Sequence, residues 1–321
     1  MHILLCMAEV RVFAGTAGQR FAQKMCADLD VPLSPVKISR FANDCLQAQL
    51  LDNCRERDVY LVQPIITPTQ ENLMELLMMI DAAKGASAQR ITAVMPHFAY
   101  ARSDKKDAPR ISIGGRLVAD LLETAGANRI LTMTLHAPQV HAFFRVPTDQ
   151  LNALRELASH FTLNDLSKTT VVSPDLGNAK PASAFAKMLG VPVAAAAKER
   201  FNDHVEITSL IGDVAGRDII VLDDEIASGG TIIAILDLLR EHGARAVRVV
   251  CTHGIFAGDG LYRIAADPDV VEIVTTDTIP STEMMAHDKL TVISVAPAFA
   301  EAVRRIHSGE SVSALFDPTH V

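Results

Sequence analysis

Short apolar runs alternate with amphipathic stretches along most of this chain. The apolar runs, rich in aliphatic and β-branched residues, predict strands near residues 10–14, 58–63, 91–96, 129–135, 169–172, 191–195, 218–222, 246–251 and 270–274. The amphipathic stretches predict helices near residues 17–29, 70–84, 112–125, 151–161, 180–189, 231–242, 258–265 and from 298 onward. Strands that alternate with helices are typical of α/β proteins with mostly parallel sheets.

A weak internal repeat divides this pattern into two halves. A Gly-Gly pair ending at Gly115 begins a predicted helix, and the strand after it closes on His136, 21 positions further on. The pair ending at Gly230 repeats this arrangement with His253, at 23 positions. The length of 321 residues is also about twice that of a typical domain. The expected domains cover residues 1–148 and 149–304.

Composition and charge narrow the class of protein. The net charge is −8 and no Lys/Arg tract or basic stripe appears, which argues against a nucleic-acid partner. No stretch approaches about 18 uninterrupted apolar residues and the N-terminus lacks a basic leader, so we expect no membrane segment and a cytoplasmic location. The five cysteines are odd in number and include no Cys-x-x-Cys pair, which indicates a reducing compartment.

The most informative segment is 218–231, where a predicted strand turns into a predicted helix. Small residues at the turn can point several backbone N–H groups at one phosphate beside the positive end of the helix: Ala227, Ser228, Gly229, Gly230 and Thr231. Asp223 and Asp224 precede the turn, and paired carboxylates there suit vicinal sugar hydroxyls or a hydrated Mg²⁺. The combination predicts a site for a phosphorylated pentose. The alternative is a solvated strand-to-helix turn.

Other charged residues also follow predicted strands. Lys198 and Arg200 are expected in a loop, where two cations can close over a chain of phosphates. Arg102, Asp104 and Lys105 follow the strand near 91–96, where phosphate contacts are expected. For these lysines and arginines the alternative is an ordinary solvated loop.

Several further segments of the chain, taken together, are specific to one family. They are Arg40-Phe41, Asn72 to Leu77, Tyr100 to Lys106, Leu121 to Ala127, Leu135 to Gln139, Val172 to Asp175 and Ser311 to Phe316. With them, nearly the whole chain resembles the ribose-phosphate diphosphokinases, also called phosphoribosyl pyrophosphate synthetases. The resemblance implies an α/β fold of two tandem type I phosphoribosyltransferase-like domains, each a mostly parallel sheet flanked by helices. It also implies that a C-terminal segment, about 305–321, packs back on the first domain.

The activity implied by the resemblance is transfer of diphosphate from ATP to the 1-hydroxyl of ribose 5-phosphate, giving phosphoribosyl diphosphate and AMP. Such a transfer needs positioning and charge neutralisation more than covalent chemistry. By the same resemblance, Lys198 and Arg200 are catalytic, and His136 and Asp175 hold Mg²⁺, although a lone His at a strand end is more often scaffold. The implied nucleotide contacts are Phe41, Asn43, Arg102, Asp104 and Lys105. The family's nucleotide site is shared between subunits, which implies a homo-oligomer, a hexamer or its dimer building block.

The chain departs from the family pattern at several of these positions. Asn43 and Cys45 replace two hydrogen-bond acceptors, which predicts a changed nucleotide preference. Leu176 and Asn178 replace residues of a His-Gly-Gly sequence, and Thr134 stands where Asp is usual. The carboxylate lost at Thr134 predicts weaker Mg²⁺ binding or an altered choice of metal. These departures keep one alternative open, a non-catalytic subunit that regulates an active homologue. A phosphoribosyltransferase that joins a base to the sugar would leave the duplicated architecture and both catalytic cations unexplained.

Overall fold

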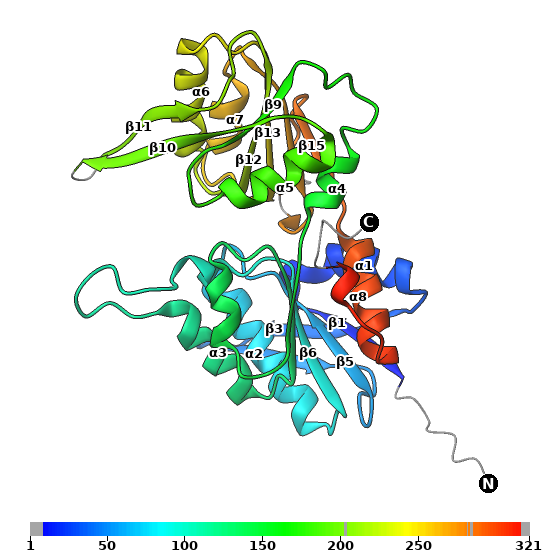
Figure 1. Ribbon diagram of the computed structural model, residues 1–321. Helices are drawn as coiled ribbons and strands as arrows, with labels where there is room; N and C mark the ends of the chain where they lie inside the picture. The colour runs from blue at the N-terminus through cyan, green and yellow to red at the C-terminus, as the bar shows by residue number, and fades with distance from the viewer. Residues whose placement is uncertain (1–8, 202–203, 281, 283–284, 316–321) are drawn as a thin grey trace. The chain divides into compact units, whose positions relative to one another are not determined.

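The chain folds into two compact units (Figure 1). The computed structural model describes residues 9–201, 204–280, 282 and 285–315. The first unit comprises the described residues of Met1–Leu151 and Ala296–Phe316, and the second those of Asn152–Val295. Each unit is built on a sheet flanked by helices, as predicted. No helix in the described ranges is long and apolar enough to cross a membrane.

The first unit contains a six-stranded sheet in which all neighbouring strands run parallel. The strand order is β2-β1-β5-β6-β7-β8. Its strands are β1 (Val10–Ala14), β2 (Leu33–Ser34), β5 (Asp58–Val62), β6 (Arg90–Met95), β7 (Arg129–Met133) and β8 (Thr148–Leu151). Every residue of β5 is buried, because helices cover both faces of the sheet.

Four helices flank this sheet. They are α1 (Gln19–Leu29), α2 (Thr69–Gly85), α3 (Gly114–Ala125) and α8 (Ala296–Ser308). Helices α2 and α3 pack on one face, where Leu76, Met79 and Leu122 join the core of the sheet. On the other face α1 packs against α8, and the rings of Phe21 and Phe299 meet edge to face with centroids 5.2 Å apart. The C-terminal helix α8 therefore completes the first unit.

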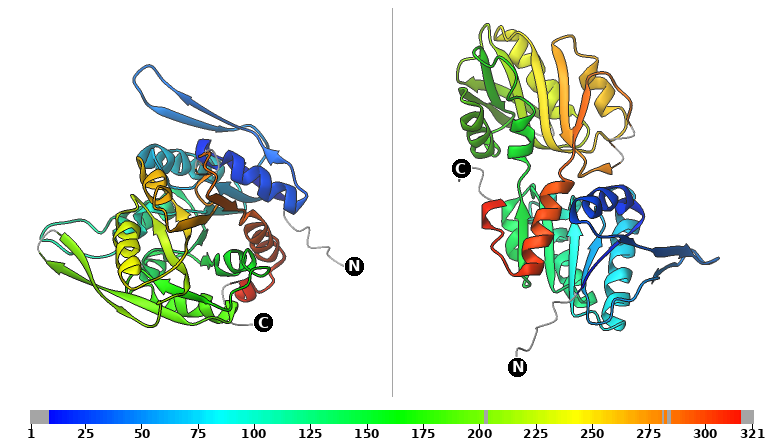
Figure 2. Two further views of the ribbon diagram at one scale, coloured as in Figure 1. Left: turned by 90° about the horizontal axis from the view of Figure 1, so that it is seen from above. Right: turned by 90° about the vertical axis from the view of Figure 1, so that its right-hand side faces the viewer.

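A two-stranded hairpin leaves the first unit and projects away from its sheet (Figure 2). Strands β3 (Val36–Arg40) and β4 (Leu46–Leu50) pair antiparallel. One side of the ribbon is half-buried, because Val36, Ala48 and Leu50 pack against the core of the unit, whereas Lys37, Gln47 and Gln49 on the other side are exposed. Four short 3-10 helices complete the described part of the unit: η1 (Thr16–Gly18), η2 (Ala99–Arg102), η3 (Pro138–Phe143) and η5 (Ser313–Leu315).

The second unit contains a seven-stranded sheet of order β11-β10-β9-β12-β13-β14-β15. Its strands are β9 (Thr169–Ser173), β10 (Val193–Phe201), β11 (His204–Ile211), β12 (Asp218–Ile226), β13 (Val247–Gly254), β14 (Val270–Thr276) and β15 (Leu290–Ile293). Its helices are α4 (Leu154–Ser159), α5 (Ala179–Leu189), α6 (Gly230–Glu241) and α7 (Gly260–Ala265). All neighbouring strands run parallel except β10 and β11, which pair antiparallel at the edge.

The expected loop around Lys198 and Arg200 is wrong, because the backbone there belongs to β10. Lys198 pairs with Ile207 of β11, and Arg200 pairs with Val205. The strand thus continues well beyond the predicted end near residue 195, since a second strand supplies the backbone hydrogen-bond partners that a solvated loop would lack.

Candidate functional site

The predicted phosphate loop connects β12 to α6 in the second unit. Gly229 has φ +83°, in the left-handed region that favours glycine, and it lets the chain turn into the helix at Gly230. The loop is held against the start of the next connection, where the N–H of Ala257 donates to the oxygen of Ala227 at 2.7 Å. The first turn of α6 has no acidic residue, and no side chain caps it. A glycine-rich turn that leads into an uncapped helix N-terminus is suited to bind a phosphate group.

Two adjacent acids lie at the end of the strand that leads into this loop. The N–H of Asp224 donates to Oδ1 of Asp223 at 2.9 Å, which ties the two residues together. Burial, the neighbouring Asp224 and, more weakly, Asp175 raise the pKa of Asp223 well above its ordinary value. This end of the sheet therefore favours partners that offset negative charge, such as sugar hydroxyls that donate hydrogen bonds or a cation.

Asp175 lies in the loop between β9 and α5, beside the end of β12. Its backbone oxygen accepts a hydrogen bond from Oγ of Ser173 at 2.6 Å, and its Oδ1 accepts one from the N–H of Asn178 at 2.9 Å. Nδ2 of Asn178 in turn donates to the oxygen of Leu222 at 2.7 Å. The structure thus brings Asp175, Asp223 and Asp224 into electrostatic contact. In the sequence, Asn178 is a departure from the family pattern, and its place close to the start of a predicted helix is a sign of a structural role.

The residues predicted to contact nucleotide phosphates lie at the end of η2 and just after it, in the first unit. Arg102 and Lys105 are exposed. Ser103 anchors this segment to α3, because its Oγ accepts a hydrogen bond from the N–H of Gly114 at 2.8 Å. The carboxylate of Asp104 accepts a hydrogen bond from Nε2 of Gln139 in η3. The segment therefore presents the cationic side chains of Arg102 and Lys105 on an anchored backbone, and Asp104 helps to anchor it.

His136, predicted to bind metal, follows β7 in the first unit and is exposed. Two residues earlier Thr134 has φ +40°, an uncommon conformation for a β-branched residue, and its N–H donates to the oxygen of Leu151 at 2.9 Å. Within the described ranges, no group of three or more His, Cys, Asp or Glu side chains is arranged to hold a metal ion by itself. Mg²⁺ is commonly bound through one or two carboxylates completed by water and substrate phosphates, so the carboxylates beside the phosphate loop fit it in that mode.

Phe41 and Asn43 lie at the turn of the β3–β4 hairpin. The N–H of Phe41 donates to the oxygen of Cys45 at 2.9 Å, and Oδ1 of Asn43 accepts a longer bond from the N–H of Cys45 at 3.3 Å. Arg40 fixes the base of the turn through Asp44 and Glu71, each at 2.6 Å. The turn therefore has a defined shape, with the Phe41 side chain 54% exposed.

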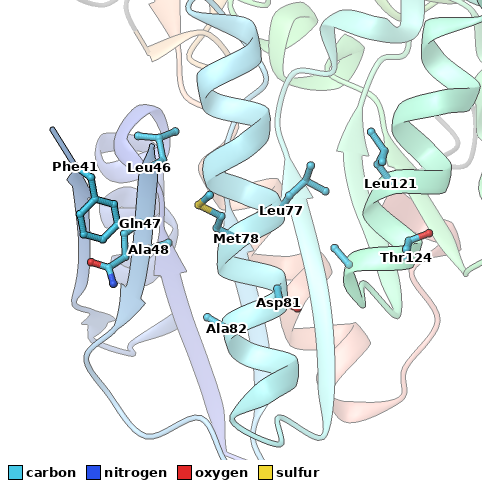
Figure 3. A pocket seen from close by; sticks show the side chains of 11 residues that line it. Phe41, Leu46, Gln47, Ala48, Leu77, Met78, Asp81, Ala82, Leu121 and Thr124 are labelled. Carbon is cyan, nitrogen blue, oxygen red and sulfur yellow. The ribbon is translucent and has the colours of Figure 1, made fainter. Parts of the chain in front are cut away.

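An open groove of about 620 Å³ lies between the hairpin, α2 and α3 (Figure 3). Phe41, Leu46 and Ala48 of the hairpin line one side, Leu77 and Met78 of α2 form the middle, and Leu121 of α3 lies opposite. This groove is mostly apolar, and none of the predicted phosphate-binding residues lines it.

The two predicted catalytic cations lie on the β10–β11 ribbon. Lys198 and Arg200 are two positions apart in β10, after an irregularity in the register between Ala197 and Lys198. Alternate residues of a strand share one face, so the backbone places both on the same face of the ribbon. The side chains of residues 197–208 lie outside the described part of the structure.

Two family models match the chain. One is the N-terminal domain of ribose phosphate pyrophosphokinase, over residues 10–126, and the other is the phosphoribosyl synthetase-associated domain, over residues 181–317. A Streptomyces coelicolor protein described as a candidate ribose-phosphate pyrophosphokinase is 66% identical, over 97% of this chain and 98% of its own length. The ribose-phosphate pyrophosphokinase of Deinococcus radiodurans is 47% identical, over 95% of this chain and 97% of its own length. Phosphoribosylpyrophosphate synthetase from Mycobacterium smegmatis has a similar structure, with a TM-score of 0.88 and 38% identity over 94% of this chain and 99% of that chain.

Proposed function

Because the chain belongs to the ribose-phosphate pyrophosphokinase family, we propose that it transfers a diphosphate group from ATP to the 1-hydroxyl of ribose 5-phosphate. The products are phosphoribosyl diphosphate and AMP. The observation that carries this proposal is the similarity over almost the full length of relatives named for the activity, at 47% identity in the case of Deinococcus radiodurans. The proposal is supported by the glycine-rich turn beside Asp223 and Asp224, whose geometry suits the sugar phosphate that the reaction needs.

In the proposed reaction the second unit binds ribose 5-phosphate. The 5-phosphate occupies the turn formed by Ala227, Ser228, Gly229, Gly230 and Thr231, where backbone N–H groups and the start of α6 offset its charge. Asp223 and Asp224 accept hydrogen bonds from the ribose hydroxyls. Each hydroxyl that donates to the Asp223 carboxylate would stabilise its ionised form and so oppose the burial and neighbouring carboxylates that raise its pKa.

The nucleotide is proposed to contact the first unit. Phe41 offers an exposed ring on an anchored turn for the base, and Asn43 supplies an amide that can both donate and accept. Arg102 and Lys105 offset phosphate charge, and Asp104 keeps their segment attached to η3. Lys198 and Arg200, on one face of the ribbon, are proposed to stabilise the diphosphate as it transfers.

Mg²⁺ is the proposed cofactor. Asp175 is the residue of this chain that best fits it, since it is an oxygen donor beside two further carboxylates, and His136 is proposed as a second ligand. When bound, the ion supplies charge neutralisation to the phosphates. The protein's own contribution is to hold Asp175 in one orientation through Ser173 and Asn178.

The proposed assembly is a homo-oligomer, a hexamer or its dimer building block, that works in the cytoplasm. The projecting hairpin supports it, because its turn presents the Phe41 ring, which is 54% exposed in the single chain. Sedimentation of the full chain with and without ATP would test this assembly, and a monomer under both conditions would contradict it.

The activity is tested by incubating the full chain with ribose 5-phosphate, Mg²⁺ and, in parallel, ATP, ADP, GTP or CTP. We expect AMP and phosphoribosyl diphosphate in equal amounts from ATP, and loss of both products in Lys198→Ala. Lys187→Ala, which removes an exposed lysine from α5 in the same unit, is the matched control and should keep the activity. Folded protein that gives no product with any donor would favour the regulatory subunit instead.

A further inference from the structure

Asn178 is buried at the start of α5, and its contacts connect the Asp175 loop with the end of β12. Its Nδ2 donates to the backbone oxygen of Leu222, one residue before Asp223, at 2.7 Å. Its backbone N–H donates to Oδ1 of Asp175 at 2.9 Å. This one residue therefore holds both the carboxylate of Asp175 and the strand that carries the proposed sugar-binding acids.

Other residues of the loop between β9 and α5 also hold Asp175 in place. Oγ of Ser173 donates to the backbone oxygen of Asp175 at 2.6 Å, which fixes the backbone at the start of the loop. A Cβ added at Gly177 would lie 3.2 Å from Oδ1 of Asp175, so the glycine leaves the carboxylate its space. Asp175 is also close enough to Asp223 to raise the pKa of that residue. The loop is thus built around one placement of the Asp175 carboxylate.

We propose that Asn178 is a positioning residue that preorients Asp175 for a divalent cation at the end of β12. This inference rests on the proposed function. A carboxylate that is already oriented by its neighbours loses less conformational freedom when it binds a cation. The side chain of Asn178 acts indirectly: its Nδ2 ties the residue to the backbone oxygen of Leu222, and the backbone N–H that is fixed in this way holds the Asp175 carboxylate. Asn178 needs no contact with the substrates.

The test uses Mn²⁺, which can be followed by electron paramagnetic resonance, as a substitute for Mg²⁺. Mn²⁺ is titrated into the full chain with ribose 5-phosphate present, and into Asn178→Ala, Asp175→Asn and the double variant. We expect Asn178→Ala to weaken Mn²⁺ binding about tenfold, as is typical when a residue that orients a metal ligand is removed. In the Asp175→Asn background the same change should have almost no further effect, because Asn178 acts through Asp175.

Equal weakening by Asn178→Ala in both backgrounds, or no weakening in either, would overturn the proposal. Asn178→Ser is measured alongside, so that the test stands if the Ala variant does not fold, and it should give the same pattern. Asn72→Ala is the control for the loss of a buried amide, since Nδ2 of Asn72 donates to the oxygen of Ile66 at 2.8 Å in the first unit. It should lower the unfolding temperature and leave Mn²⁺ affinity unchanged.

Product formation by the unmodified chain, measured in the same samples, separates this inference from the proposed function. If the unmodified chain forms phosphoribosyl diphosphate and the two substitutions act independently, only the role of Asn178 is overturned. If the unmodified folded chain forms no product, the proposed function is overturned and the role of Asn178 falls with it.

Discussion

At the scale of single residues, the two adjacent glycines of the phosphate loop have different roles. Gly229 has φ +83°, and an added Cβ would meet Cδ1 of Ile264 at 3.0 Å, whereas an added Cβ at Gly230 would meet nothing within 4 Å. We expect Gly229→Ala to lower the free energy of unfolding by about 1–2 kcal/mol, the cost of a left-handed backbone for an L-residue. Gly230→Ala should instead leave it unchanged or raise it by up to about 1 kcal/mol, because alanine favours the helix. Urea denaturation measures both, and equal losses would contradict these assigned roles.

The raised pKa of Asp223 makes a prediction about stability and pH. The pKa of the Asp223 carboxyl is higher in the folded protein than in the unfolded one. Its contribution to the free energy of unfolding is therefore fully present below the unfolded-state pKa, and it is lost as the pH rises through the folded-state pKa. Asp223→Asn should therefore stabilise the ligand-free protein at neutral pH, by about 0.5–2 kcal/mol. This gain in the free energy of unfolding should shrink as the pH falls toward about 4, the ordinary pKa of an Asp carboxyl group.

Unfolding midpoints of Asp223→Asn and unmodified protein across this pH range test the prediction. Asp237→Asn, at an exposed position of α6, is the control and should change the free energy of unfolding by less than about 0.5 kcal/mol. A stabilisation by Asp223→Asn that grows as the pH falls would contradict the assigned cause.

The strand-to-helix turn of the proposed phosphate loop could be predicted from the sequence because its signals are local, and the binding of phosphate there stays a prediction. Small residues and paired acids between a strand and a helix are enough to indicate an anion and sugar site. The role of Asn178 could not be predicted, because its partner Leu222 is 44 positions away and the contact exists only after β9 and β12 pair. The roles of Lys198 and Arg200 stay predictions, since the structure describes only their backbone.

At the scale of elements, the C-terminal helix α8 is a structural part of the first unit. Phe299 is fully buried and meets Phe21 of α1 edge to face. We expect Phe299→Ala to lower the free energy of unfolding by about 3–5 kcal/mol, through lost burial and the cavity that remains. Phe41→Ala removes the same side chain where it is 54% exposed, and it should cost under about 1 kcal/mol. Chemical denaturation compares the two, and similar losses would contradict the assigned packing of α8.

The central parallel strands were predicted, but the parallel edge strands β2, β8 and β15 and the antiparallel ribbons were not. Strands such as β5 and β9 are recognisable because they are rich in β-branched and apolar residues and are buried along their whole length. The β3–β4 and β10–β11 ribbons lack this signal. Polar residues interrupt the apolar ones in β3, β4 and β11, β10 is mostly alanine before Lys198, and the pairing of these strands depends on partners found only in the fold. The same limit explains why the segment at Lys198 was expected to be a loop.

At the scale of the whole molecule, the proposed site places acidic side chains close to strongly negative substrates, in a chain whose net charge is −8. Carboxylates beside phosphates repel them unless cations intervene. We therefore expect removal of divalent ions with EDTA to abolish formation of phosphoribosyl diphosphate, and added Mg²⁺ to restore it. Asp175→Asn should raise the Mg²⁺ concentration needed for half-maximal rate about tenfold or more. Full activity in EDTA would contradict the proposed use of the ion.

The most direct test of the central claim is to follow a label from the β-phosphate of ATP. The full chain is incubated with ribose 5-phosphate, Mg²⁺ and ATP labelled at that position, and the products are separated. Transfer of an intact diphosphate predicts that the label appears in phosphoribosyl diphosphate, in amounts equal to the AMP formed. Label that stays in ADP, or AMP formed without labelled phosphoribosyl diphosphate, would contradict the proposed function.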